Sequence, residues 1–276
     1  QEELGLSEIR RSREFPNGRP ARINAAFLAA ATPKSAMPEK AVRMAEEANG
    51  FLAKQLQLAD VGLRITQHED RGYISIESEQ LILDSVLSEL AIETATDLDA
   101  PHAESLAYLV NDFINESDPS RKAVYAVAAG VDFQQLSKWP GEKLITEGSL
   151  PGKDEIVLNE WIAEDLGLAA GDSLRMKYFL IDAHGETEEK EALFKVHSVV
   201  PLADDRLSTD RGLVPEVKGI TDVKKFQDIK TPFPMDLDAV SDRDDVYWEK
   251  LGPTPKVFLP LAAAQKMWQT RHGRLT

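Results

Sequence analysis

Residues 156–174, IVLNEWIAEDLGLAAGDSL, constrain the fold of this chain more than any other stretch, because they specify a complete strand-helix-strand unit. Asn159 follows a short apolar strand and is a preferred helix N-cap residue. Ile162 and Leu166 are four residues apart, so they lie on one face of the short helix. Gly167 then supplies a left-handed helix stop, and a Gly-Asp turn leads into the next strand.

The same pattern raises the alternative of a phosphate-binding loop, in which glycines lie between a strand and the start of a helix. Here Gly167 and Gly171 follow the helix instead, and no G-x-x-x-x-G-K-[ST] motif occurs. Capping accounts for the polar residues, so we interpret the unit as structural.

Flanking segments predict further strands and helices. Before residue 132 we first expect a helix opened by Pro38, with a buried face of Ala41, Met44, Ala48 and Phe51 or Leu52. A hairpin at 62–67 and 72–79 follows, and then a helix capped by Asp84 with an apolar stripe of Val86, Leu87, Leu90 and Ala91. Two strands, at 105–114 and 122–131, complete this part of the chain. After residue 172 we expect a hairpin at 173–182 and 191–202, with Leu174, Met176, Tyr178 and Leu180 on one face, and a final strand and helix carrying Leu261, Ala264, Gln265 and Trp268.

Two regions have weaker periodicity. Residues 1–37 read as a leader with a strand near 23–28, and residues 203–255, rich in proline, glycine and aspartate, read as a long ordered excursion over the surface. Trp139, Phe233, Tyr247 and Trp248 lie in or beside loops, where they serve either to pin the excursion to the body or to form a contact patch. We favour pinning, since a loop of this length needs anchors.

Charge and composition exclude several classes of protein. The 47 acidic and 32 basic side chains give a net charge of −15, which repels nucleic acid and anionic lipid. The chain has no cysteine, so disulfides, thiolate zinc sites and cysteine nucleophiles are excluded. The longest apolar run, AAFLAAA at 25–31, is far shorter than the roughly 20 residues that cross a bilayer, so the chain as given is expected to be soluble.

A search for catalytic or metal-binding patterns singles out no residue, so we predict no catalytic, cofactor-binding or metal-binding residues and no cofactor. Counted from Asp236, residues 236–247 lack the glycine and the glutamate of an EF-hand loop, so we interpret their aspartates as caps and solvated surface. The histidines at 68, 102, 184, 197 and 272 are scattered. The carboxylate pairs Asp204 and Asp205, and Glu188 and Glu189, lie in polar runs, and a hydrolase using such a pair stays open as a hypothesis.

Several ordered segments resemble one family. The extracytoplasmic region of FtsX-like ABC transporter permeases, which include MacB, resembles the segments EIVLNEWIAEDLGLAAGDSLRMKYF, FKVHSVVPL, GITD, PFPMDLD, YWEKLGPTPKVFLPLAAAQKMW and HGRLT, and the shorter YLVNDF and VYAVAAGVD. The likeness covers residues 60–276.

The resemblance implies an α+β fold with a mixed α/β porter-like part and a mostly β sabre-like part. Residues 38–131 would be porter-like, 132–260 sabre-like, and 261–276 a helix returning toward the porter part. It further implies a non-catalytic periplasmic domain between two transmembrane helices, which transmits ATP-driven movement from a cytosolic ATPase. The expected partners are those helices, that ATPase, a second permease copy and an envelope protein or lipoprotein, with no nucleic acid. The alternative function is a secreted module that binds carbohydrate or protein through loop aromatics.

Overall fold

A computed structural model describes residues 37–138, 144, 148–181, 187–203, 207–229, 235–270 and 272–276. By its internal contacts the chain divides into two units, residues 1–57 and residues 58–276. In the first unit, the predicted helix is present as α2 (Met37–Gln55). The prediction that it has a buried apolar face is wrong for Phe51 and Leu52, which expose 66% and 56% of their surface. Helical spacing predicts such a face but not a surface that covers it. The side chains of Ala41 and Met44, and the expected strand near 23–28, lie outside the described residues.

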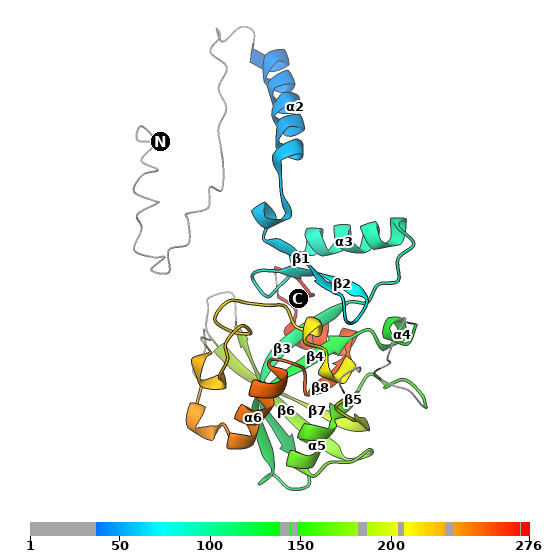
Figure 1. Ribbon diagram of the computed structural model, residues 1–276, viewed down its shortest axis with the longest axis vertical. Helices are drawn as coiled ribbons and strands as arrows, with labels where there is room; N and C mark the ends of the chain where they lie inside the picture. The colour runs from blue at the N-terminus through cyan, green and yellow to red at the C-terminus, as the bar shows by residue number, and fades with distance from the viewer. Residues whose placement is uncertain are drawn as a thin grey trace. The chain divides into compact units, whose positions relative to one another are not determined.

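The second unit is built on a closed six-stranded barrel with the strand order β3-β4-β8-β5-β7-β6 (Figure 1). Its strands are β3 (Ser105–Asn115), β4 (Lys122–Val131), β5 (Glu155–Asn159), β6 (Ser173–Ile181), β7 (Thr187–Val200) and β8 (Val257–Pro260). Two neighbouring pairs, β4-β8 and β5-β7, are parallel, and the other four are antiparallel. The strands predicted in these six segments are thus confirmed, with β7 spanning Thr187–Val200 rather than 191–202, and the fold is mixed α+β.

The barrel interior is filled by the alternating apolar residues of its strands. Fully buried examples are Leu106, Val110, Phe113, Leu158, Leu174, Met176 and Leu259. Helix α7 (Leu261–Trp268) packs against this core, and Ala264 approaches Gly130 of β4 so closely that no side chain fits at position 130. Trp268, 1% exposed, stacks on Tyr108 with 4.9 Å between the ring centroids.

The strand-helix-strand unit has the predicted structure. In α5 (Glu160–Leu166), the Asn159 side chain accepts a hydrogen bond from the Ile162 amide at 3.0 Å. Ile162 and Leu166 are fully buried. Gly167 has φ 62° and ψ 41°, the left-handed conformation that ends the helix.

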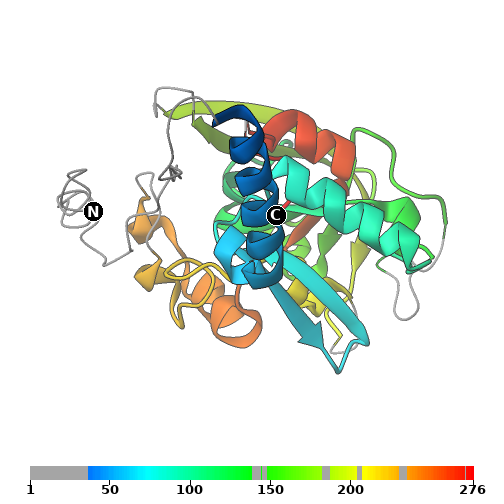
Figure 2. The same cartoon turned by 90° about the horizontal axis from the view of Figure 1, so that it is seen from above.

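A separate hairpin and a helix precede the barrel in sequence. The hairpin consists of β1 (Leu63–His68) and β2 (Tyr73–Ser78), and it follows the short 3-10 helix η2 (Leu58–Val61). Helix α3 (Ser85–Asp97) runs beside this hairpin (Figures 1 and 2) and is capped by Asp84, as predicted. Only part of its apolar stripe is covered. Leu87 packs against the buried cluster of Leu63, Leu83 and Leu275, whereas Val86 and Leu90 are 64% and 52% exposed.

The excursion at 203–255 forms short helical turns and one longer helix. They are η3 (Leu207–Thr209), η4 (Arg211–Leu213), η5 (Phe226–Asp228), η6 (Leu237–Ala239) and α6 (Asp242–Leu251); a further short helix, α4 (Phe133–Leu136), follows β4. Helix α6 has no counterpart in the sequence prediction. It begins with a capping box formed by Ser241 and Asp244.

The expected boundary at residue 131 falls at the end of β4, inside the closed barrel. Strand β3 pairs with β6 and β4 pairs with β8, so both sides of that boundary belong to one sheet. Pairings between strands this distant in sequence leave no local signal, so the sequence alone could not reveal that one barrel spans residue 131.

Candidate functional site

The polar face of the β1-β2 hairpin faces the start of the excursion. Because strand side chains alternate, this face carries Arg64, Thr66, His68, Tyr73, Ser75 and Glu77. The Tyr73 hydroxyl donates to Asp210 Oδ2 at 2.9 Å, and Asp210 in turn caps η4 by accepting from the Gly212 amide. A Cβ at Gly212 would lie 2.9 Å from His68 Nε2, so the two segments meet at a position where only glycine fits.

A chain of hydrogen bonds joins His68, Ser75 and Glu77, the residue types of a serine hydrolase. Ser75 Oγ lies 2.9 Å from His68 Nε2 and 2.5 Å from Glu77 Oε1. The serine has one proton, and an ionised carboxylate only accepts, so that proton goes to Glu77 and the histidine must donate to Ser75. A catalytic histidine would instead accept the serine proton. This arrangement is therefore a structural bridge.

Glu77 fastens the hairpin to the excursion. Its Oε2 accepts from Arg64 Nη2 at 2.8 Å and from the Glu216 backbone amide at 3.2 Å. Burial alone would raise the pKa of the Glu77 carboxyl, but hydrogen bonds from Ser75, Arg64 and Glu216 hold this pKa below its usual value. The carboxyl is therefore ionised at neutral pH.

The far end of the excursion is held by a buried ion pair. Lys256, 4% exposed, lies just before β8, and its Nζ is 2.6 Å from Asp244 Oδ1 in α6, which is 9% exposed. Burial opposes ionisation of Asp244, but Lys256 and the Ser241 hydrogen bonds lower the pKa of this carboxyl. The Lys256 ammonium also lies 4.5 Å from the centre of the Tyr247 ring. Asp244 also caps α6, as the interpretation of these aspartates as caps and solvated surface allows, but it is buried rather than solvated.

Tyr247 and Trp248 anchor the excursion, as expected. The Tyr247 hydroxyl accepts from Asn159 Nδ2 at 2.9 Å and donates to the Thr254 carbonyl, and burial raises its pKa. The Trp248 indole donates to the Val223 carbonyl at 3.0 Å. Both side chains are buried, which is unlike an exposed aromatic platform. Trp139 and Phe233 lie outside the described residues.

Tyr125 in β4 is a third anchor, which the sequence did not reveal. Its φ is +48°, a conformation that tyrosine rarely adopts within a strand. The Tyr125 hydroxyl accepts from the Asp236 amide at 2.7 Å, and its ring stacks on Phe226. Phe226 contacts Trp248 edge-on at 5.2 Å between centroids. A bend in the barrel strand thus directs an aromatic side chain onto the excursion.

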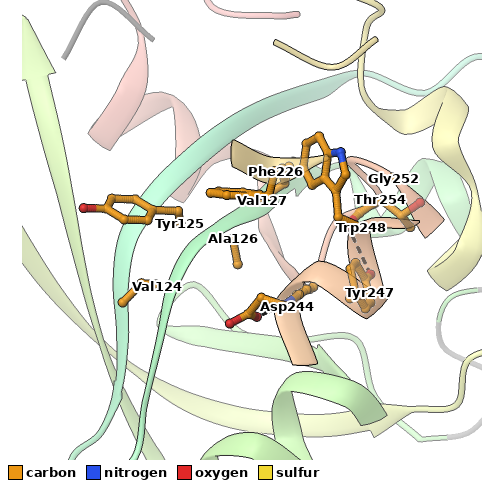
Figure 3. A pocket seen from close by; sticks show the side chains of 11 residues that line it. Val124, Tyr125, Ala126, Val127, Phe226, Asp244, Tyr247, Trp248, Gly252 and Thr254 are labelled. Carbon is orange, nitrogen blue, oxygen red and sulfur yellow. Dashed lines mark hydrogen bonds and ion pairs between the residues drawn. The ribbon is translucent and has the colours of Figure 1, made fainter. Parts of the chain in front are cut away.

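Helices α5 and α6 are joined by Arg243, which pairs with both Glu164 and Asp165. Burial raises the pKa of the Asp165 carboxyl, and Arg243 and Lys256 oppose that rise. A carboxyl with a raised pKa is a feature of some active sites. Asp165 is not among the residues that line the cavity next to Asp244, between β4 and the excursion (Figure 3), and that cavity holds about 10 Å³, room for one water at most. No substrate fits there.

The other groups considered from the sequence do not assemble into a site. Within the described ranges, no three His, Asp or Glu side chains are placed to hold a metal ion. Glu188 and Glu189 are exposed on β7, and His184, Asp204 and Asp205 lie outside the description. Ser241 and Asp244 cap α6, so the stretch after Asp236 is not a calcium loop.

Neither a protein-family model nor a curated protein matches the chain. In the part of the chain that is described, no helix is both long enough and apolar enough to span a bilayer.

Proposed function

We propose that this chain is a non-catalytic extracytoplasmic domain of an FtsX-like, MacB-like ABC transporter permease. On this proposal it lies on the outer side of the bacterial cytoplasmic membrane, and ATP is hydrolysed in a separate cytosolic domain or subunit. The domain transmits the resulting movement to substrate export or release, or to an envelope partner. The division into a porter-like and a mostly β sabre-like part belongs to this proposal, but it does not fall at residue 131, because both sides of that position contribute strands to one barrel. The family resemblance of residues 60–276 motivates the assignment.

One observation carries the mechanical part of the proposal: the excursion is fastened to the rest of its unit at both ends. Near residue 210 it is held by Tyr73 and Glu77, and near residue 250 by the Lys256-Asp244 pair and Asn159. A closed barrel also has no free sheet edge along which strands can slip. A body held in this way moves as a unit, which is what transmission of force requires.

The assignment is tested by the coding sequence on either side of this chain and by spin labelling of the full-length protein. We expect an apolar segment of about 20 residues on each side and an ATPase reading frame nearby. Since the chain has no cysteine, labels can be placed at Leu193→Cys on β7 and Val246→Cys on α6, which are 58% and 40% exposed. On ATP addition, the distance between these labels within one chain should stay constant, while distances between copies change. Flanks without apolar segments, or a changing distance within one chain, would refute the proposal.

A further inference from the structure

An open hollow of about 530 Å³ lies around the turn of the β1-β2 hairpin. Glu69, Tyr73 and Ile74 of the hairpin line it together with Pro101, which follows α3. The Tyr73 ring stacks on His68, with 4.5 Å between the centroids. The hollow has the volume of a site for a peptide side chain or a small ligand.

An apolar row leads from the hydrophobic core to this hollow. Ile65 lies opposite Ile76 in the hairpin, and Ile74 follows Ile76 on the same face. At one end Ile76 packs against the buried cluster that contains Leu63, whereas Ile65 and Ile74 are 49% and 59% exposed. Leu98, three residues before Pro101, is 73% exposed. Exposed apolar side chains that continue a core in this way indicate a contact surface longer than the hollow itself.

The surroundings of the hollow are negatively charged. No lysine or arginine occurs between Arg71 and Arg121, and Arg71 donates to Thr209 of the excursion at 3.3 Å. The carboxylates of Glu69 and Asp70 in the turn, of Asp97 at the end of α3 and of Asp99 just after it are exposed. Such a potential attracts cationic groups and repels anionic ones.

We infer that the hollow and its apolar row bind a segment of a partner protein that combines apolar with basic side chains. The apolar row favours a peptide segment over a small ligand, and the carboxylates around the hollow favour basic side chains in that segment. The inference depends only on the hairpin and α3, so it holds or fails independently of the transporter assignment.

The test is a titration of the full chain with a fluorescein-labelled helical peptide of about 15 residues made of leucine and lysine. A peptide of the same charge, in which serine replaces leucine, is the control. We expect the serine peptide to bind about tenfold more weakly, and added salt to weaken both. Ile74→Ser should weaken binding of the leucine peptide roughly tenfold, whereas Leu193→Ser, a matched exposed residue on the barrel, should have no effect.

A second pair of variants separates local from overall charge. Glu69→Gln and Glu249→Gln remove the same charge from exposed positions, the first at the hollow and the second on α6. Only Glu69→Gln should weaken binding, by about threefold. Thermal melts should be unchanged in all four variants, because the side chains are exposed. Equal binding of the two peptides, or equal effects of Ile74→Ser and Leu193→Ser, would overturn the inference.

Discussion

Replacing Lys256 by methionine tests whether the buried ion pair holds the excursion on the barrel. The substitution keeps much of the side-chain volume but leaves the Asp244 carboxylate buried without its cation. Breaking a buried pair by removing one partner costs about 3–5 kcal/mol. We expect the lower end, about 3 kcal/mol, because Asp244 keeps its hydrogen bonds from the Ser241 side chain and amide. That is a large share of a typical domain stability of about 5–15 kcal/mol.

The matched variant is Asp244→Asn, which can keep the capping hydrogen bonds while removing the negative charge. It leaves Lys256 buried against the Tyr247 ring, and we expect a similar loss of about 3 kcal/mol. The double variant has no buried charge at this site, so the second substitution should cause no further loss of stability. The resulting coupling energy of about 3 kcal/mol lies at the upper end for residues in contact.

The pH dependence has a defined sign. In the parent chain the folded-state pKa of Asp244 is lowered, so its contribution to stability is present above the unfolded pKa of about 4 and is lost as pH falls. In Lys256→Met, burial dominates and raises the folded-state pKa above the unfolded value. The free-energy cost of burying the unpaired Asp244 carboxylate is then present at high pH and disappears as pH falls through that folded-state pKa. The difference between parent and variant should therefore shrink from pH 7 toward pH 4.

Urea unfolding followed by tryptophan fluorescence measures these losses, with unchanged m-values as the check that the unfolding transition is comparable. Trp248 lies in α6, so its emission reports on this region. Two results would refute the reasoning. The first is a double variant whose loss in free energy of unfolding equals the sum of the two single losses. The second is a loss for Lys256→Met that stays constant down to pH 4.

Three further predictions concern the other anchors. Gly212→Ala places a Cβ 2.6 Å from His68 Cε1, so it should destabilise the fold by about 1–3 kcal/mol and speed amide hydrogen exchange at residues 209–216. The control is Gly50→Ala, where an added Cβ meets no neighbour, and equal exchange rates in the two variants would contradict this prediction. Asn159→Ala removes the α5 cap and a hydrogen bond to Tyr247, so thermal melts should show a loss of stability of about 2–3 kcal/mol. A loss under about 1 kcal/mol would show that the buried hydrogen bond to Tyr247 contributes nothing. The lowered pKa of Glu77 makes its contribution present above pH 4 and lost below it, so Glu77→Gln should flatten the acid limb of stability against pH, and an unchanged limb would count against this role.

Local patterns predicted most elements because their causes are local. Asn159 and Gly167 cap α5 through hydrogen bonds within a few residues, and the alternation of Leu174, Met176 and Tyr178 defines the inward face of β6. The same reasoning missed α6, whose mean apolar content is low and whose buried side chains Tyr247 and Trp248 are adjacent rather than periodic. It also placed a boundary at residue 131, where the chain passes between two strands of one barrel.

The anchors of the excursion could be predicted only in part. The aromatic residues Tyr247 and Trp248 stood out in a loop-like segment, and both bury against the body. The Ser241-x-x-Asp244 spacing of a capping box is a local signal for Asp244 as a cap, but nothing local predicted its burial or distinguished Lys256 from exposed lysines. Their pairing depends on α6 meeting the segment just before β8, and burial of the ion pair is decided by that meeting.

The sequence by itself determined the strand-helix-strand unit, the two hairpins, the mixed α+β class and the absence of thiol chemistry, because each follows from neighbouring residues or from composition. Only the tertiary structure decided that the strands close into one barrel, that Tyr125 adopts a positive φ, and that Gly212 must lack a side chain beside His68. Those features depend on contacts between residues far apart in the chain. Residues 156–174 specified their own structure, whereas the Tyr247 that covers Asn159 came from 88 positions away.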